Sequence, residues 1–247
     1  MGGLSRSGTR RRGTLSRDLV LRTAVGLADE GGIGVVSMRR LAQHLGVEPM
    51  SLYHHVADKE DLLDGMVDAV VDEINKRVAG VPDTDPGAWK AVLRRRILTA
   101  REVLLAHPWA PQVIMSRTAM SPAVMRYYEE LAGLLRRGGL SISLIHHAMH
   151  ALGSRSLGFN QELFSPQGDR QEPDDDGADP EAAAMMMERM AADFPTLTEI
   201  AVIESGTHDQ DSTLGWCDDQ FEFEFGLDLI LDGIERLHRT AGESPLG

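Results

Sequence analysis

Residues 45–56 read LGVEPMSLYHHV, and the interpretation of the whole chain depends on this stretch. It places a tyrosine and two adjacent histidines a few positions after a glycine and a proline, and two arginines precede it at 39 and 40. A metal site, a catalytic pair and a DNA-reading helix all use side chains of these types. The sequence on either side of the stretch distinguishes between the three.

Two patterns typical of amphipathic helices flank the stretch. Upstream, Ser37 is placed to cap a helix and Gly46 to end it. The apolar residues of that helix recur at i, i+3, i+4 and i+7, and they are Met38, Leu41, Ala42 and Leu45. Pro49 then opens a further short helix, because proline is accepted in a first turn. Asp58 is placed to cap a long helix with the apolar face Leu63, Met66, Val67, Val70 and Ile74.

Two short helices joined through a glycine predict a helix-turn-helix, since one helix precedes them from Ser16 and a long one follows. The major groove of DNA is about 12 Å wide and admits one helix. A reading helix must therefore be anchored on one side only, and Leu52 with Val56 are the expected anchor. The side chains left for DNA are Pro49, Met50, Ser51, Tyr53, His54 and His55. The alternative is a generic helical hairpin.

A shared metal ion is not expected at the two histidines. Neighbouring positions on a helix diverge by roughly 100°, so His54 and His55 point in different directions. A neutral imidazole can donate or accept a hydrogen bond at a phosphate or a base edge, and protonation strengthens the phosphate contact. We therefore expect both histidines to contact DNA.

The charge is unevenly distributed along the chain. The formal net charge is −13, which argues against a nucleic-acid partner for the chain as a whole. The first 57 residues nevertheless carry eight arginines against four acidic residues, so the acidic excess lies entirely beyond them. This distribution favours a basic head that contacts a polyanion. A basic tail on an ordinary acidic protein would have the same distribution.

Composition indicates a cytoplasmic protein. No apolar run approaches the roughly 20 residues of a membrane span, and no signal peptide is recognisable at the N-terminus. Cys217 is the only cysteine, so no internal disulfide is expected, which fits a reducing compartment.

The chain is predicted to be all-α, with two domains. Residues 1–15 form a disordered basic arm, 16–80 the helix-turn-helix domain with its linker helix, and 87–247 a larger helical domain. The joint is VPDTDP at 81–86, and an acidic loop at 165–179 is expected to be disordered. Helices are expected near 87–106, 108–116, 121–138, 141–163, 181–193 and 215–240, with a short helical turn at 200–203. At 221–225 a helical pattern competes with a strand-like alternation, and the longer helical pattern is favoured.

The sequence VSMRRLAQHLGVEPMSLYHHVADKEDLLDGM, residues 36–66, resembles the tetracycline-repressor (TetR) family of transcriptional regulators. The resemblance implies that Arg39 reads a base and that Lys59 binds a phosphate. It places Ser37 and Met38 at phosphate-facing positions and Met50 and Ser51 at the floor of the groove. It assigns contacts to base or backbone to Tyr53, His54 and His55. The family's proline falls at Met50, which can offer only an apolar contact, for instance to a thymine methyl group.

The C-terminal domain resembles the family more loosely. Residues 225–234 are similar to its last, dimer-forming helix, which implies a homodimer built with a helix inside 141–163. A dimer that binds a palindromic operator also makes geometric sense, because two half-sites multiply the specificity of one short helix.

An effector pocket is also implied by the resemblance. Its expected lining is Trp109, Ile114, Met115, His147 and Phe159, with Asn75 where the family has a pocket histidine. Ile114 falls where the tetracycline repressors have a metal-binding histidine. We therefore expect no cofactor and no magnesium–tetracycline chelate, and a small apolar or aromatic effector instead.

Other functions fit the sequence less well than a ligand-responsive repressor does. No nucleophile–base pair, phosphate loop or zinc spacing stands out, so the chain is not expected to be an enzyme. The helical spacing of His146, His147 and His150 could suit a metal, but no carboxylate or cysteine completes the set, and an interface or pocket-lining role is favoured. The methionines at 185–190 favour a packing face. The alternative from another class is an architectural DNA-binding protein without a ligand.

Overall fold

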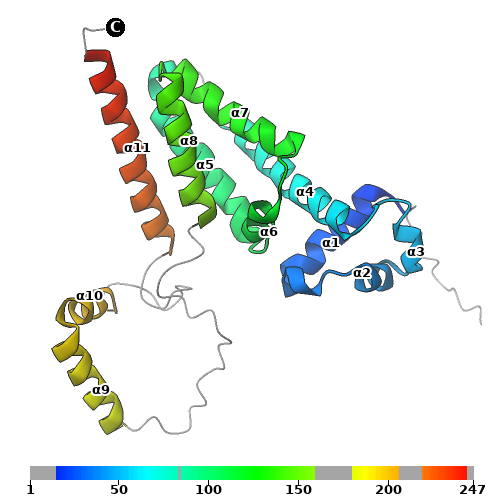
Figure 1. Ribbon diagram of the computed structural model, residues 1–247, viewed down its shortest axis with the longest axis horizontal. Helices are drawn as coiled ribbons and strands as arrows, with labels where there is room; N and C mark the ends of the chain where they lie inside the picture. The colour runs from blue at the N-terminus through cyan, green and yellow to red at the C-terminus, as the bar shows by residue number, and fades with distance from the viewer. Residues whose placement is uncertain (1–14, 83–84, 159–179, 206–218, 244–247) are drawn as a thin grey trace, which may run out of the picture. The chain divides into compact units, whose positions relative to one another are not determined.

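The computed structural model describes residues 15–82, 85–158, 180–205 and 219–243. All regular structure in these ranges is helical and no strand occurs in them, which confirms the all-α prediction (Figure 1). By its own contacts the chain divides into two compact units, Met1–Gly139 and Leu140–Gly247. The basic arm predicted at 1–15, apart from Leu15, and the acidic loop predicted at 165–179 lie outside the described residues.

The first unit contains two short 3₁₀ helices and seven α-helices in its described part. The elements in chain order are α1 (Arg17–Gly31), η1 (Ile33–Val35), α2 (Met38–Leu45), α3 (Pro49–Leu52), α4 (Lys59–Ala79), η2 (Pro86–Ala88), α5 (Trp89–Ala106), α6 (Ala110–Ser116) and α7 (Pro122–Arg137). Helices α1 to α3 and the first turns of α4 form the head, by which we mean residues 16–66.

Short polar residues cap the helices of the head, as the sequence predicts. The side chains of Ser16, Ser37 and Asp58 accept hydrogen bonds from backbone N–H groups in the first turns of α1, α2 and α4. Such caps satisfy donors that have no partner within the helix. Gly46 ends α2 in the left-handed conformation at φ 68°, which a residue with a side chain rarely adopts.

One apolar core holds the head together. Leu41 of α2, Leu52 of α3, and Leu62 and Met66 of α4 are completely buried. Full burial of one such side chain stabilises the fold by about 1.5–3 kcal/mol. The same helix α4 also packs against α5, α6 and α7. Helix α4 thus contacts both the head and the helices that follow it. The apolar residues predicted to face inward on α4 are buried, which confirms that prediction.

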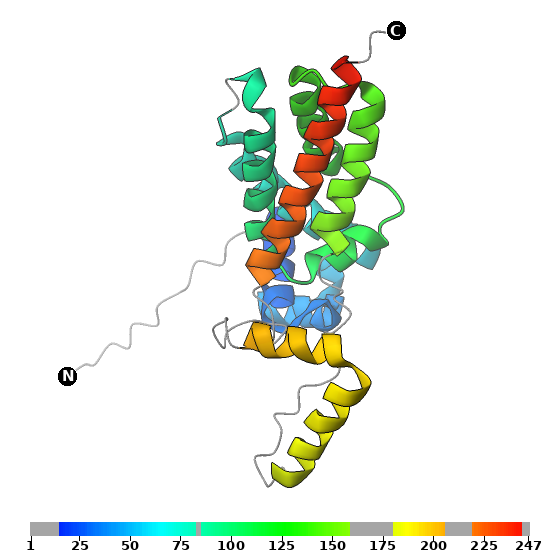
Figure 2. The same cartoon turned by 90° about the vertical axis from the view of Figure 1, so that its left-hand side faces the viewer.

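The described part of the second unit contains α8 (Ile142–Gly158), α9 (Pro180–Asp193), α10 (Pro195–Ser205) and α11 (Asp219–Glu243). Helices α8 and α11 lie side by side (Figures 1 and 2). Phe223 and Leu227 are completely buried on α11, so the strand-like alternation at 221–225 is helical, as the longer pattern predicted. Arg155 of α8 crosses to α11, donates to the carbonyl of Glu222 and lies 5.2 Å from the centroid of the Phe223 ring.

Helices α5, α6, α10 and α11 differ from the prediction at their ends or in length. Helix α6 begins at Ala110 rather than at residue 108, because Pro108 and Trp109 form the turn that leads into it. The short turn predicted at 200–203 is an eleven-residue helix, α10. Pro195 explains the difference, since proline stands at the first position of α10, where no backbone donor is needed. None of the described helices combines the length and the apolarity that crossing a membrane requires.

Candidate DNA-binding head and its junctions with the body

Helix α3 and the turn after it present one apolar side to the core and a mixed side to solvent. Leu52 is completely buried and Val56 is 1% exposed, whereas Met50 is 71% and Tyr53 is 44% exposed. The anchor predicted from the sequence is therefore confirmed. An exposed methionine and tyrosine on a short, one-sided helix form a surface that can enter a DNA groove.

The other predicted DNA-binding residues lie at three places in the head. Ser37, Met38 and Arg39 stand at the N-terminus of α2, where Ser37 is the cap and Arg39 is exposed. Pro49, Ser51 and His55 are half-buried on α3 and its turn, and His54 is exposed there. Lys59 is the exposed first residue of α4. Helices α2 and α3 pack against each other, so the first two groups lie on neighbouring elements.

An ion pair that the sequence did not indicate joins α1 to α4 within the head. The two terminal nitrogens of Arg17 lie 3.0 and 2.7 Å from the two carboxylate oxygens of Asp61. The Arg17 side chain also donates to the carbonyl of His55 at 2.8 Å, and Asp61 accepts from the backbone N–H of Ala57 at 2.7 Å. The hydrogen bonds from Arg17 and Ala57 hold the pKa of Asp61 below its ordinary value. A separation of 44 residues explains why no sequence pattern indicates this pair.

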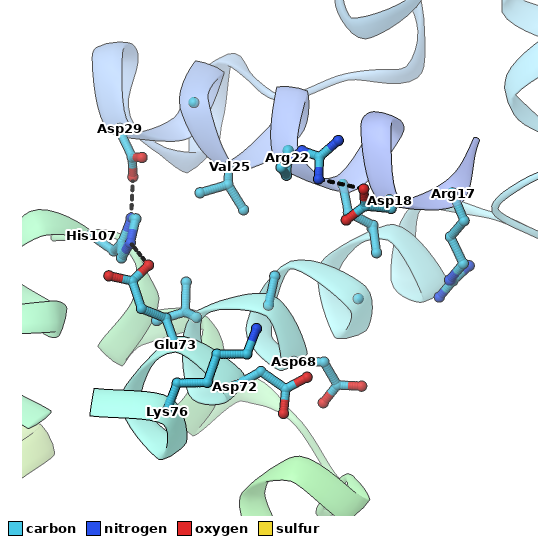
Figure 3. A pocket seen from close by; sticks show the side chains of 15 residues that line it. Arg17, Asp18, Arg22, Val25, Asp29, Asp68, Asp72, Glu73, Lys76 and His107 are labelled. Atoms are coloured by element: carbon cyan, nitrogen blue, oxygen red, sulfur yellow. Dashed lines mark hydrogen bonds and ion pairs between the residues drawn. The ribbon is translucent and has the colours of Figure 1, made fainter. Parts of the chain in front are cut away.

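A second junction joins α1 to the turn between α5 and α6. One carboxylate oxygen of Asp29 accepts from the Trp109 indole N–H at 2.7 Å and lies 2.8 Å from Nδ1 of His107. The other ring nitrogen of His107 lies 3.7 Å from a carboxylate oxygen of Glu73 on α4 (Figure 3). Helices α1 and α4 and the α5–α6 turn thus meet at one imidazole ring, which lies near the carboxylates of Asp29 and Glu73.

The far end of α6 is joined to α4 by a third junction. Arg117 follows the last residue of α6 and lies 2.7 Å from Glu60 and 3.1 Å from Asp64. These two carboxylates hold the pKa of the Arg117 guanidinium above its ordinary value. Helix α6 is therefore joined to the head at both ends, to α1 near its start and to α4 near its end.

A cleft of about 770 Å³ lies between α1 and α4 (Figure 3). Its lining combines small and apolar residues, such as Gly26 and Ala69, with charged ones. His107 and Asp29 stand at one end of the cleft and Arg17 at the other. None of the residues predicted to line an effector pocket lines this cleft.

The residues predicted to line the effector pocket have different surroundings. Trp109 is buried, and Ile114 is half-buried against the same core. The Asn75 amide donates to the carbonyl of Ala123 at 3.1 Å. Met115 is 53% exposed. In the second unit His147 is exposed on α8, where the neighbouring His146 and His150 rings lie 4.7 Å apart, and Phe159 lies outside the described residues.

Helices α5 and α7 carry buried polar groups that the sequence did not indicate. Tyr127 on α7 stacks edge-on against Tyr128 at 5.9 Å, and burial raises the pKa of the Tyr127 phenol, which therefore stays neutral. Arg96 of α5 is 5% exposed and lies 3.7 Å from Glu130. Among the described residues, no group of three or more histidine, cysteine or acidic side chains could hold a metal ion.

Comparison with known proteins identifies the family. Residues 20–66 match the model of the bacterial regulatory proteins of the tetR family, and residues 81–238 match the model of the tetracyclin repressor-like C-terminal domain. The chain belongs to the TetR family. The first match covers the helix-turn-helix from α1 to the second turn of α4, as the sequence predicted. TetR proteins are transcriptional regulators, which agrees with the sequence argument for a regulator.

Relatives of similar length support the assignment. The chain is 32% identical over 236 residues to the HTH-type transcriptional repressor DrrR1 of Streptomyces coeruleorubidus, covering 94% of this chain and 82% of that protein. It is 26% identical over 229 residues to the class C tetracycline repressor of Escherichia coli, covering 93% and 94% of the two chains. The apo structure of ActR from Streptomyces coelicolor has 27% identity and a TM-score of 0.69, with 93% and 99% coverage. ActR bound to actinorhodin has 28% identity and a TM-score of 0.65, with 91% and 98% coverage.

Proposed function

We propose that this TetR-family protein is a homodimeric repressor that binds a palindromic operator and is released from it by a small apolar or aromatic molecule. The observation that carries the proposal is the one-sided burial of α3. Leu52 and Val56 are fixed in the core while Met50 and Tyr53 project into solvent. This arrangement lies within the region that matches the family's DNA-binding model.

In this proposal residues 16–80, which are the head and the rest of its linker helix α4, form the DNA-binding domain. Arg39 reads a base edge from the start of α2, and Met50 and Ser51 lie at the floor of the major groove. Tyr53, His54 and His55 contact bases or backbone beyond them. Lys59 binds a phosphate, together with Ser37 and Met38.

The homodimer is supported by an apolar stripe on α11. Phe221, Phe225, Leu229 and Leu237 follow one another at multiples of four residues, and each is between 53% and 59% exposed. A stripe of this kind on a single chain is typical of a surface that another chain covers. Ile142 on the neighbouring helix α8 is 64% exposed and could extend it. Two-fold pairing through α8 and α11 would give the protein two reading helices for two half-sites about one DNA turn apart.

Residues 87–247 would hold the effector. ActR has been solved with actinorhodin and with (S)-DNPA, so a related protein of this family accommodates small molecules. The resemblance to the tetracycline repressors implies a metal-binding histidine at Ile114, and the hydrocarbon side chain of Ile114 offers no ligand to magnesium. Trp109 and Ile114 favour an apolar or aromatic ligand.

The test begins with duplexes that the wild-type protein selects from a random-sequence library. Affinity for the selected duplex should fall by on the order of 10³ or more between 50 and 200 mM salt if six or more phosphates are contacted per dimer. Arg39→Ala should lose discrimination at one base position per half-site, whereas Lys59→Ala should weaken all duplexes alike. If no sequence is enriched, or if affinity does not depend on salt, the DNA-binding assignment is wrong.

The test for an effector uses the same duplex. Polycyclic aromatic and long-chain apolar compounds are tested for release of the labelled duplex, with magnesium–tetracycline as the comparison compound. We expect release by a member of the apolar set and none by the chelate. A protein that no compound releases from DNA would instead be an architectural binder.

A further inference from the structure

We propose that Arg17 and Asp61 are positioning residues for DNA reading: together they fix the turn at residues 53–57 against the start of α4. The inference rests on the proposed DNA-binding function. Neither residue belongs to the set expected to contact DNA.

The pair holds both sides of one buried anchor. Val56 is 1% exposed. The carbonyl immediately before it, that of His55, accepts from Arg17 at 2.8 Å. The N–H immediately after it, that of Ala57, donates to Asp61 at 2.7 Å. Arg17 and Asp61 also bond to each other, so one continuous set of hydrogen bonds joins the start of α1, the end of the reading element and the first turn of α4.

The reading element needs such support from outside. Helix α3 has only four residues, and its N-cap residue Glu48 makes no side-chain capping bond. A single helical turn has little stability of its own, because nucleation costs more than one turn of hydrogen bonds returns. Leu52 and Val56 fix its depth on the core. The polar bonds to His55 and Ala57 fix the direction in which the backbone leaves it.

The pair suits positioning better than it suits general stabilisation. The Arg17 and Asp61 side chains are 45% and 33% exposed, and exposed ion pairs add little to the stability of a fold. The planar fork of an arginine, however, can bond two carboxylate oxygens and a carbonyl with fixed directions. Helix α4 leaves room for the Arg17 side chain at Gly65, because a Cβ there would lie only 3.2 Å from an Arg17 terminal nitrogen.

The consequence concerns the distance between two DNA-contacting groups. Tyr53 and His54 lie on the turn that the pair holds, and Lys59 lies on the helix turn that carries Asp61. If the pair is broken, the turn can shift relative to Lys59 while the core stays intact. Specific binding should then weaken, because it requires simultaneous contact with base edges and phosphates, whereas sequence-independent binding to phosphate should persist.

The deciding variant is Asp61→Asn. All three groups that bond to Asp61 are donors, so an amide cannot satisfy them with both of its ends. The substitution also removes one negative charge from the head, and by charge alone it should tighten binding to any DNA. If Asp61 positions the reading element, the variant should instead bind the specific duplex more weakly. Asp18→Asn is the matched control, because Asp18 is an exposed carboxylate in the first turn of α1 that pairs with Arg22 and makes the same charge change.

Affinities are measured for the duplex selected by the wild-type protein and for a shuffled duplex of equal length. We expect Asp61→Asn to lower the ratio of specific to shuffled affinity by about tenfold or more, comparable to a mismatched base pair. Asp18→Asn should leave the ratio unchanged. If Asp61→Asn keeps the wild-type ratio while the wild type prefers its selected duplex, the positioning role is refuted and the proposed function stands. If the wild type itself shows no preference, the proposed function fails first.

Two further variants keep the test decisive. Should Asp61→Asn unfold at the assay temperature, as judged by far-UV circular dichroism, Arg17→Gln replaces it and must lower the same ratio. The exchanged pair Arg17→Asp with Asp61→Arg restores opposite charges but would present a donor to the Ala57 N–H and an acceptor to the His55 carbonyl. We expect no recovery of the ratio in the exchanged pair. Recovery would show that only the ion pair matters and would overturn the proposal.

Discussion

Replacing Asp29 by alanine tests whether the junction between α1 and the α5–α6 turn is a structural support of the first unit. A single carboxylate oxygen accepts from the Trp109 indole at 2.7 Å and lies 2.8 Å from Nδ1 of His107. Alanine removes both contacts at once. No other hydrogen-bond acceptor for the Trp109 indole is present in the described part of the structure.

The magnitude follows from the burial of the donors. Trp109 is 4% exposed, so its N–H cannot be solvated freely once the carboxylate is gone. A hydrogen bond to a charged group contributes about 1.5–3 kcal/mol, and an unsatisfied buried donor costs a similar amount. The His107 side chain is 12% exposed and the Asp29 side chain 28% exposed, so water can replace part of that contact. We expect a loss of roughly 2–3 kcal/mol in the free energy of unfolding.

Equilibrium unfolding in urea measures this loss, followed by tryptophan fluorescence and by far-UV circular dichroism. Glu30→Ala is the control, since Glu30 is the next residue on α1, is exposed and carries the same charge. We expect Glu30→Ala to change the free energy of unfolding by less than about 0.5 kcal/mol. If Asp29→Ala is no more destabilising than Glu30→Ala, the junction does not support the fold and the reasoning from burial is wrong.

Three further predictions concern other parts of the molecule. Gly138→Ala should destabilise the first unit by about 1–3 kcal/mol in urea unfolding, because the new Cβ would lie 2.7 Å from the Trp89 ring; no loss would mean that α7 can move away. The lowered pKa of Asp61 contributes stability above the ordinary value of 3.8 that is lost as pH falls through the lower folded value. Because the pair is exposed, the urea midpoints of the wild type and Asp61→Asn should differ only slightly at pH 7, and this difference should disappear as the pH falls through the lowered pKa of Asp61. A difference that grows as the pH falls would contradict the bond to Arg17. Leu229→Asp should produce folded monomers in sedimentation velocity, and an unchanged mass would exclude the α11 stripe as the dimer surface.

Local patterns predicted the head well. Each cap lies within three residues of the donor it satisfies, and the inward positions of α2 and α4 follow helical periodicity. Leu52 and Val56 are buried because they are four residues apart on one short amphipathic element. These features depend on neighbours in the sequence, and for that reason sequence alone was sufficient.

Junctions between distant segments were not predictable. Asp29 and Trp109 are 80 residues apart, and Arg117 and Glu60 are 57 residues apart. Each of these side chains looks like an ordinary surface charge or core aromatic in the sequence, and only the folded chain brings them together. Helix α10 was underestimated for a different reason: only a short helical turn was predicted at 200–203, whereas the helix begins at Pro195 and has eleven residues.

The family resemblance supplied what periodicity could not. Roles for Arg39 and Lys59 came from it, and the exposure of both residues is compatible with those roles. The structure gives less support to the residues predicted to line the effector pocket, because Trp109 and Asn75 already form hydrogen bonds with other protein groups. A ligand at these side chains would have to pack beside existing hydrogen bonds or displace them.

Selection of duplexes from a random library, followed by native mass spectrometry of the selected complex, tests the central claim most directly. A dimeric reader with one α3 per chain should enrich an inverted repeat whose half-sites lie about one helical turn, roughly 34 Å, apart. Each duplex should carry an even number of protein chains. Enrichment of a single asymmetric site bound by one chain, or no enrichment at all, would contradict the account.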